Sequence, residues 1–294
     1  MGVWIDTDMG VDDLFAVLLV LQHRKVDGLS LSFGNAPLDQ VVKNIAGAVA
    51  QFDWDMPIYA GADRALLGAV ETAQRILGNS GMPSRGTRLP DAIAAYPPTL
   101  TAFIDWLEGQ KAAEILALGP LTNLATLALA RPDLLPRIAR LTWMGGGITR
   151  GNHTASAEFN ALADPESLAV LLSRSVPLTM VDLDACRRVE ITEPDVQSLT
   201  DPLLKDLLGG YLDIALTRGR PTMALYDPVA AAALVKPALF DFAPAQITVE
   251  LAGQHTRGRT IVDQRAPQAA NAMIVQNLDA AAVKTLCLSA LATS

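Results

Sequence analysis

The sequence predicts an α/β protein built on a doubly wound, mostly parallel open sheet of the Rossmann-like type. Short apolar stretches with the length of buried strands alternate with stretches whose apolar residues recur at helical spacing. The first of these strands runs directly into a cluster of carboxylates, and open α/β sheets bind their ligands at such strand ends. Because no repeat or low-complexity linker interrupts the 294 residues, we expect residues 1–294 to form one domain.

The expected strands are short runs rich in aliphatic residues, and two of them are followed at once by a helical pattern. In chain order the strands are residues 3–5, 29–33, 57–59, 115–118, 141–144, 178–181, 247–251 and 260–262. The helical patterns are Leu14, Val17, Leu18 and Leu21 after the first strand, and Leu121, Leu124, Leu127 and Leu129 after the fourth. Trp4 and Trp143 fall within strands and are expected in the core, whereas Trp54 and Trp106 are expected at the periphery.

Two glycine- and proline-containing segments are expected to be loops. Residues 77–89 are too long for a simple connection, so a lid over a binding site and an ordinary surface loop both stay open. Residues 217–224 contain Gly219 and Pro221 and lead into Tyr226-Asp227-Pro228.

Composition excludes several classes of function. A formal net charge of −8 argues against binding to nucleic acid or to an anionic membrane, so a small neutral or cationic ligand fits better. Cys186 and Cys287 have neither the number nor the spacing of a disulfide framework or a zinc site. The chain start lacks the features of a signal peptide, and no apolar run has the length of a membrane span, so we expect a cytoplasmic protein.

The strongest local signal is the acidic segment at the end of the first strand. Asp6, Asp8, Asp12 and Asp13 bring four carboxylates into eight residues. Such close like charges repel and raise the pKa values of some members unless a metal or a cationic substrate compensates them. The alternative is a polar turn that happens to be acidic, but the position at a strand end favours a ligand site.

Three familiar motifs fail on inspection of single positions. A phosphatase pattern of two aspartates fails because Gly10 stands where threonine or valine is needed. An EF-hand fails because Gly10 and Val17 offer no side-chain oxygen at the positions of a calcium loop. The glycines at 145–147 fail as a dinucleotide fingerprint because Arg150 occupies the place of the third glycine.

Further polar residues follow the other expected strands. In a parallel sheet these strand ends meet at one edge, so their side chains would surround a single crevice. Taken singly, each has a simpler role as a turn residue, a helix cap or a surface charge. The residues are Asn35, Thr122, Asn123, Asn152, Glu158, Asn160 and Asp227.

Together these motifs carry a resemblance that spans nearly the whole chain. The segment Asp6 to Asp13 is similar to the signature Asp-Thr-Asp-Pro-Gly-x-Asp-Asp, with Met9 in place of proline. Other matching segments are Phe33-Gly34-Asn35, residues 57–62, Asn79-Ser80-Gly81-Met82, residues 119–123, Met144-Gly145-Gly146, Gly151-Asn152, residues 157–160, Asp164-Pro165 and Tyr226-Asp227-Pro228. The chain thus resembles the inosine-uridine-type nucleoside hydrolases.

The resemblance implies a Ca²⁺ ion at the bottom of the pocket. Its ligands would be the carboxylates of Asp8, Asp13 and Asp227 and the backbone carbonyl of Thr122, with Asp6 orienting them. Carboxylate and carbonyl oxygens are the ligands that calcium prefers.

The resemblance also implies a reaction, the hydrolysis of the N-glycosidic bond of purine or pyrimidine ribonucleosides to ribose and free base. Asp8 would remove a proton from a metal-activated water, and the sugar would pass through an oxocarbenium-like transition state suited to an anionic pocket. The ribose hydroxyls would be bound by Asp12, Asn35, Asn152, Glu158 and Asn160. A homodimer or homotetramer is the expected assembly.

The residues that would assist the departing base differ from the family pattern. Leu77 and Tyr226 stand where well-known members carry histidine. Tyr226 is expected to take a catalytic role, either by stacking on the base or by donating a proton or hydrogen bond. His153 is interpreted first as a solvated loop residue, with an acid role left open. Two rival functions therefore remain: hydrolysis of another N-riboside, and ligand binding without catalysis.

Overall fold

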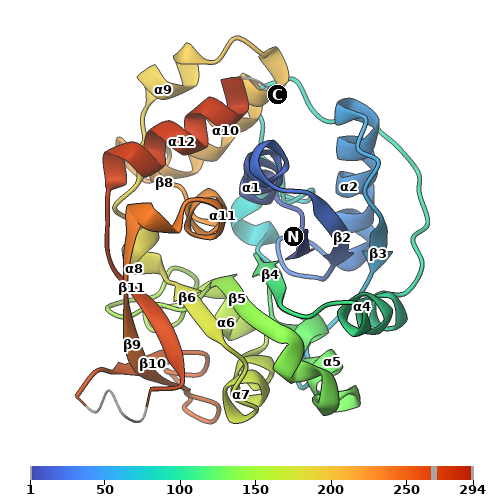
Figure 1. Cartoon of the computed structure of the whole chain (residues 1–294). Helices are drawn as coiled ribbons and strands as arrows, with labels where there is room; N and C mark the ends of the chain where they lie inside the picture. Colours follow the sequence, from blue (N-terminus) through green and yellow to red (C-terminus); the bar gives the residue numbers. More distant parts are fainter. Residues whose placement is uncertain (1, 266–269, 293–294) are drawn as a thin grey trace.

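The computed structural model describes residues 2–265 and 270–292, and its centre is a single large sheet (Figure 1). In the described residues the sheet has nine strands in the order β10-β9-β11-β6-β5-β4-β1-β2-β3. The strands from β3 to β11 run parallel, and β9 and β10 add an antiparallel edge. The strands are β1 (Val3–Thr7), β2 (Val26–Leu31), β3 (Ile58–Ala60), β4 (Ala113–Ala117), β5 (Ile138–Met144), β6 (Leu178–Val181), β9 (Phe240–Val249), β10 (Thr260–Asp263) and β11 (Ala272–Leu278), and a separate pair consists of β7 (Glu190–Ile191) and β8 (Met223–Ala224).

Helices cover both faces of this sheet, as the doubly wound prediction requires. The helix α1 packs mainly on α11 and α12 on one face, and α5 packs on α4 and α7 on the other. The α-helices are α1 (Val11–His23), α2 (Leu38–Phe52), α3 (Gln74–Leu77), α4 (Thr99–Glu108), α5 (Thr122–Ala130), α6 (Phe159–Ala163), α7 (Pro165–Ser173), α8 (Leu183–Cys186), α9 (Glu193–Ser198), α10 (Pro202–Leu216), α11 (Asp227–Val235) and α12 (Ala280–Ala292). Two short 3₁₀ helices are η1 (Pro132–Arg137) and η2 (Pro237–Leu239).

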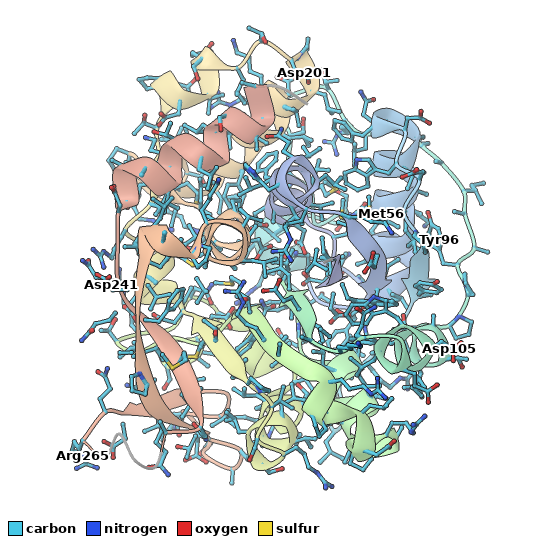
Figure 2. All side chains as sticks on the ribbon, viewed as in Figure 1. Met56, Tyr96, Asp105, Asp201, Asp241 and Arg265 are labelled. Atoms are coloured by element: carbon cyan, nitrogen blue, oxygen red, sulfur yellow. The ribbon has the colours of Figure 1, made fainter. Side chains whose placement is uncertain are left out.

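Two hydrophobic cores follow from the alternation of side chains along the central strands. In β1, Val3 and Ile5 point into the core beneath α1, while Trp4 points into the opposite core and stacks on Phe103 of α4. Trp143 is fully buried in the same core as Trp4. Figure 2 shows side chains filling the space on both sides of the sheet. The expected core positions of Trp4 and Trp143 are confirmed.

The order of the strands places the acidic segment at a switch point. From β1 the chain proceeds to β2 and β3 on one side, and it later returns to β4, β5 and β6 on the other side. The connections therefore diverge at the carboxyl ends of β1 and β4, which is where open α/β sheets leave a crevice. Leu118 follows β4 there and donates its N–H to the carbonyl of Asp6 in β1.

All eight strands expected from the sequence exist, but only the one at residues 178–181 agrees at both ends, and three further strands were not expected. The strand expected at residues 247–251 is the end of β9, which begins seven residues earlier at Phe240. The strand β11 was not expected, although it lies between β9 and β6. Its second half contains exposed Gln276 and Asn277, which break the apolar run that identified the other strands. The pair β7 and β8 consists of only two residues each, too few to carry a sequence pattern.

The glycine-rich segment expected at residues 77–89 is attached to α10 and α9. Arg85 forms ion pairs with Glu193 at 2.8 Å and with Asp213 at 2.7 Å. Gly210 lets the loop approach α10, because a Cβ atom at this position would lie 2.5 Å from the backbone of Ser84. These contacts anchor the middle of the segment, while Leu77 belongs to α3; a lid motion stays a prediction.

Two further properties of the chain concern its cysteines and its helices. Cys186 and Cys287 are both free thiols, and both are buried. Within residues 2–265 and 270–292, no helix is both long enough and apolar enough to cross a bilayer.

Candidate active site

The acidic segment is a tight turn between β1 and α1 that buries all of its carboxylates. Asp6, Asp8, Asp12 and Asp13 are at most 8% exposed. Met9, at the centre of the turn, has a φ of +33°, which the fixed φ of proline excludes. The turn therefore has a backbone that the proline of the signature could not adopt, and non-glycine residues in this region are strained.

Hydrogen bonds from the turn and from the end of β2 fix Asp8 and Asp13. Asp13 accepts from the hydroxyl of Thr7 and from the backbone N–H of Gly10 at 2.8 Å. Asn35 joins the two acids: its N–H donates to Asp8 Oδ2 at 2.6 Å, and its side-chain Nδ2 donates to Asp13 Oδ2 at 2.8 Å. Asn35 thus orients the carboxylates, in addition to lining the cavity.

A carboxylate at residue 8 needs the glycines around it. A Cβ atom on Gly34, whose φ is +157°, would lie 1.9 Å from Asp8 Oδ2, and one on Gly119 would lie 3.1 Å from Asp8 Cγ. The strand ends of β2 and β4 therefore close around Asp8 from two sides. This contact explains why glycine follows Phe33 and Leu118.

The carboxylates lie close enough to share one cation. One oxygen each from Asp12, Asp13 and Asp227 falls within 4.8 Å of the others, and Asp227 comes from the first turn of α11, more than two hundred residues away. Burial raises the pKa of Asp227 and Asp8 well above the usual value, and repulsion from the neighbouring acids raises it further. In the described residues, no lysine or arginine forms an ion pair with any of these four acids.

Such a donor set fits a hard divalent cation. Four buried carboxylates without a cationic partner are unfavourable by themselves, and a metal ion would favour their charged forms. Burial and repulsion from Asp13 raise the pKa of Asp12 to about 7, while the hydroxyl of Tyr211, which donates to Asp12 at 2.9 Å, opposes the rise. The residues present therefore fit a metal ion.

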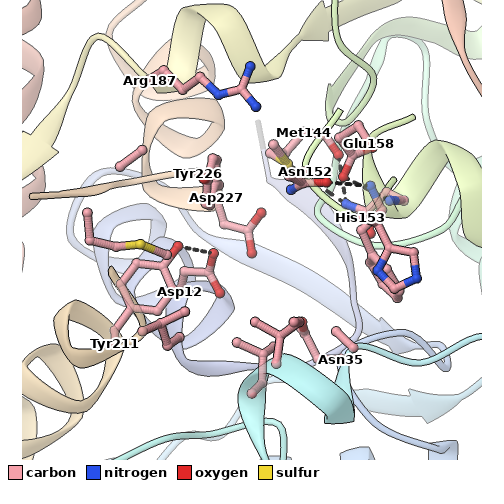
Figure 3. A pocket seen from close by; sticks show the side chains of 18 of the residues that line it. Asp12, Asn35, Met144, Asn152, His153, Glu158, Arg187, Tyr211, Tyr226 and Asp227 are labelled. Atoms are coloured by element: carbon pink, nitrogen blue, oxygen red, sulfur yellow. Dashed lines mark hydrogen bonds between the residues drawn. The ribbon is translucent and has the colours of Figure 1, made fainter. Parts of the chain in front are cut away.

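A cavity of about 620 Å³ opens above this cluster (Figure 3). It brings together eight of the residues singled out from the sequence, which come from the ends of β1, β2 and β5 and from the starts of α1, α6 and α11. These are Asp8, Asp12, Asn35, Asn152, Glu158, Asn160, Tyr226 and Asp227. Asp13 does not line the cavity, but it belongs with Asp12 and Asp227 to the cluster that could hold a metal ion.

Thr122 does not line the cavity, and the expectation that its carbonyl binds a metal stays a prediction. Its hydroxyl donates to Asp164 at 2.6 Å, and its carbonyl accepts from the Thr126 hydroxyl at 2.8 Å within α5. Leu118 lines the cavity instead, at the end of β4 and directly before the glycine that touches Asp8. The chain turns between these residues, so the helix carries the backbone of Thr122 away from the crevice.

Asp6 also lies beneath the cavity and not in its wall. Its carboxylate accepts from the hydroxyl of Ser30 and from Asn123 Nδ2 at 2.8 Å. Asn123 in turn accepts from the N–H of Ala62 at 2.8 Å, so this pair connects β1, α5 and the end of β3. Asn123 is therefore not a helix cap, and Asp6 holds together the strands that carry the site.

The wall opposite Asp227 is built around Glu158. Its carboxylate accepts from the N–H groups of Gly146 and Asn160, both at 2.8 Å, and it caps α6. Burial raises the pKa of Glu158 to about 7, although these N–H donors oppose the rise. Asn160 Nδ2 donates to the carbonyls of Leu118 at 2.7 Å and Met144 at 3.0 Å. Glu158 is thus neither a surface charge nor only a cap.

His153 is not the solvated loop residue that the sequence suggested. Its side chain is only 8% exposed, its Nε2 lies 2.8 Å from Glu71 Oε1, and its ring meets Phe159 edge-on. The preceding Asn152 accepts from the N–H of Phe159 at 3.0 Å. Both residues line the cavity on the side away from Tyr226, as Figure 3 shows.

Apolar and aromatic side chains make up part of the cavity lining. They include Leu77 and Tyr226, together with Ile76, Phe159 and Ile214. Burial raises the pKa of Tyr226 to about 12, opposed by the nearby guanidinium groups of Arg187 and Arg220. The hydroxyl is therefore protonated at neutral pH and available as a hydrogen-bond donor.

Several wall residues carried no signal in the sequence. Tyr211 lies in the middle of α10 within an apolar pattern, and Leu118 and Met144 read only as the ends of strands. Arg187 follows α8 and donates to the carbonyl of Gly151 at 2.9 Å. Only the folded chain brings these residues to the cavity.

Comparison with known families gives a match over almost the entire chain. The family model described as "Inosine-uridine preferring nucleoside hydrolase" matches residues 3–285. Among curated proteins, the chain is 30% identical over 274 residues to the "Non-specific ribonucleoside hydrolase RihC" of Shigella flexneri serotype 5b (strain 8401), covering 90% of this chain and 88% of that protein. It is 31% identical over 279 residues to the "Pyrimidine-specific ribonucleoside hydrolase RihA" of Citrobacter koseri (strain ATCC BAA-895 / CDC 4225-83 / SGSC4696), with the same two coverages.

Solved structures show the same fold. The "Purine-Preferring Ribonucleoside Hydrolase from Gardnerella vaginalis" superimposes with a TM-score of 0.90 at 24% identity, over 99% of this chain and 98% of that chain. The "Inosine-Guanosine Nucleoside Hydrolase (IG-NH)" gives 0.88 at 24% identity, over 99% and 98%. The doubly wound, mostly parallel α/β fold is confirmed.

Proposed function

The chain belongs to the inosine-uridine preferring nucleoside hydrolase family, and from that premise we propose how its cavity hydrolyses ribonucleosides to ribose and free base. The observation that carries the proposal is the cluster of buried carboxylates on the cavity floor at the end of β1. Cleavage of an N-glycosidic bond builds positive charge on the sugar, and an anionic floor stabilises that charge.

Ca²⁺ is the proposed metal, held by the carboxylates of Asp8, Asp13 and Asp227. The carbonyl of Leu118, at the adjacent strand end, is a better placed backbone ligand than that of Thr122. The donor set supports a hard cation with oxygen ligands. When bound, the cation would neutralise the cluster and lower the pKa of water at the cavity floor.

Asp8 is the proposed base, which takes a proton from the attacking water. Its carboxylate lines the cavity and is held by the N–H of Asn35 at 2.6 Å, so it is presented to the sugar in a fixed position. The water oxygen bonds to the anomeric carbon while the electron pair of the glycosidic bond passes to the base nitrogen.

Asp12, Asn35, Asn152, Glu158 and Asn160 are proposed to bind the ribose hydroxyls. The two sides of the cavity present acceptors and donors together, which suits hydroxyl groups because each hydroxyl both donates and accepts. Tyr211 supports this role by fixing Asp12 through a 2.9 Å hydrogen bond.

Discrimination against 2′-deoxyribose tests these ribose contacts. We expect kcat/KM for 2′-deoxyinosine or 2′-deoxyuridine to be lower by at least about 10²-fold than for the ribonucleoside, because buried polar groups would lose their partner. Measuring both sugars with the same base isolates the effect. Equal kcat/KM values for the ribonucleoside and the 2′-deoxyribonucleoside would contradict the proposal that the cavity floor binds the 2′-hydroxyl.

Tyr226 is proposed to act on the leaving base. We expect Tyr226→Phe to lower kcat/KM for natural nucleosides by about 10-fold, the low end of acid–base or hydrogen-bond assistance, and to affect p-nitrophenyl riboside much less. The activated phenolate leaves without a donor, whereas a nucleobase needs one. Parallel initial rates with the two substrate types measure the difference.

Tyr211→Phe is the matched control for that measurement. It also removes one buried tyrosine hydroxyl at the cavity, but this hydroxyl acts on Asp12 and so on the sugar. It should slow both substrate types equally. If Tyr226→Phe did the same, a positioning role would replace the proposed role in leaving-group assistance.

The choice of base is open between purines and pyrimidines, because the apolar side chains of the cavity lining could pack on a planar ring of either kind. Hydrolysis of inosine, adenosine, uridine and cytidine beside p-nitrophenyl riboside tests the proposed function as a whole. Turnover of another N-riboside in preference to all four would favour the first rival function. Ligand binding without turnover, even of the activated riboside, would favour the non-catalytic one.

Homodimer or homotetramer assembly also stays a proposal, together with one domain over residues 1–294. Exposed Leu67, Val70 and Ile93 lie in the long connections around α3 and before α4, and apolar residues in such positions are common at subunit interfaces. Light scattering of the purified protein measures the mass directly. A cytoplasmic location stays a prediction.

A further inference from the structure

Arginines gather at the cavity opening, in contrast to the acids on its floor. Arg150 lies in the loop after β5, Arg187 follows α8, and Arg218 and Arg220 lie in the turn between α10 and β8. All four line the cavity, although the chain has a net charge of −8. Glu190 is the one exposed acid among the cavity-lining residues.

Three of these guanidinium groups are available to a ligand. Arg187 is partly committed, because it donates to the backbone of the 150–151 loop and lies 3.5 Å from Asp184. Arg150, Arg218 and Arg220 are exposed, and in the described part of the chain none forms an ion pair. An unpaired arginine at the opening of a pocket can bind an anion with little cost of desolvation.

The arginines lie on the side where the leaving group must stand. The buried acids and amides on the floor take the sugar, so the aglycone faces the opening. Arg187 and Arg220 line the same cavity as Tyr226. In Figure 3, Arg187 and Tyr226 stand across the cavity from Asn152, His153 and Glu158.

This chain also lacks a histidine on that side. Leu77 and Tyr226 occupy the two positions; the leucine has no polar group, and the tyrosine offers a single neutral hydroxyl. A leaving group that departs with the glycosidic electron pair then needs another source of stabilisation. Guanidinium groups supply it electrostatically, since they hold negative charge without transferring a proton.

We propose that the cavity selects ribosides whose leaving group carries a negative charge, bound at Arg220 beside Tyr226, where the partly committed Arg187 adds further positive charge. This inference rests on the proposed hydrolase function and specifies its substrate class, a carboxylated or otherwise anionic base.

The step balances without any further reactant. Water gives its oxygen to the anomeric carbon and one proton to Asp8, and the bond between this carbon and the leaving group breaks. Both electrons of that bond go to the leaving group, which departs with one additional negative charge beside the arginines and takes up a proton from solvent. Asp8 later releases its proton to solvent, so ribose and base are the net products.

Matched aryl ribosides test the proposal without depending on purine or pyrimidine preference. We would compare kcat/KM for 3-carboxy-4-nitrophenyl riboside and its neutral 3-carbamoyl counterpart, in the wild type and in Arg220→Gln. The carboxy-to-carbamoyl ratio should fall by about two- to fivefold in the variant, the range for an ion pair still reached by water. It should also fall in the wild type at ~1 M salt, which screens exposed charges.

Arg131→Gln is the control. Arg131 stands directly after the end of α5, does not line the cavity, and pairs with Glu108 and Asp133. It should leave the ratio unchanged. Arg218→Gln provides a second variant at the opening should Arg220→Gln fold poorly. A ratio equal in wild type and both opening variants, and insensitive to salt, would overturn the proposal.

The arginines could instead bind a negative charge on the sugar, and the 5′-phosphate of p-nitrophenyl riboside tests this alternative. If this phosphate is preferred and Arg220→Gln removes that preference alone, the arginines serve the sugar side and the proposal is wrong. Good turnover of the neutral carbamoyl riboside without a charge effect would contradict this inference and still support the hydrolase function. Absence of turnover with every riboside would contradict both the inference and the proposed function.

Discussion

Asp8→Asn is expected to lower kcat by about 10³-fold, within the range of 10²–10⁴ for loss of a positioned general base. The asparagine has the same shape and can still accept the 2.6 Å hydrogen bond from the N–H of Asn35, so the loss should come from the missing base and metal ligand. Steady-state hydrolysis of p-nitrophenyl riboside measures it, because this substrate needs no assistance to the leaving group.

A second readout separates loss of chemistry from loss of fold. Burial and repulsion from neighbouring acids raise the pKa of Asp8, so the metal-free protein is destabilised by keeping this side chain charged. Thermal unfolding without metal should therefore show Asp8→Asn at least as stable as the wild type. Near-wild-type turnover in a folded variant would remove Asp8 from the role of base.

Asp227→Asn is expected to weaken metal binding more than chemistry. Asp227 supplies one of the clustered carboxylates, and its pKa is raised by burial and then by repulsion from Asp12 and Asp13. Losing one charged ligand should raise the Ca²⁺ concentration for half-maximal turnover by at least about 10-fold, as loss of even outer partners of a metal site does. A calcium titration of turnover after chelation measures the shift, and excess calcium should restore most of the rate.

Asp182→Asn is the matched control for this titration. Asp182 is fully buried at the end of β6 and accepts from the N–H of Asp184 at 2.8 Å, but it does not line the cavity. Its substitution removes a buried carboxylate of similar environment. The calcium dependence should stay that of the wild type; an equal shift in both variants would mean a general effect of lost negative charge.

The fold could be predicted from sequence where apolar runs are continuous. The strand at residues 178–181 is correct at both ends, because its four residues are all buried. The strand β11 was missed because its exposed second half breaks the run, although pairing with β6 and β9 stabilises it. The strand β11 thus forms because of its pairing with neighbouring strands, which the local sequence pattern does not show.

The site, like the fold, could be predicted only in part. The acidic segment and the polar strand ends could be identified from the sequence, because a parallel sheet brings such strand ends together. The choice between Leu118 and Thr122 was not readable, because it depends on where the backbone turns into α5. The environment of His153 depends on Glu71 and Phe159, and no spacing in the sequence brings the first of these to it.

The most direct test of the central claim is hydrolysis of p-nitrophenyl riboside by metal-stripped protein, before and after Ca²⁺ is added back. We expect negligible turnover in the stripped protein and recovery with calcium, because the buried carboxylates of the cavity floor are proposed to act around a cation. Full turnover in protein shown to be free of metal would contradict it.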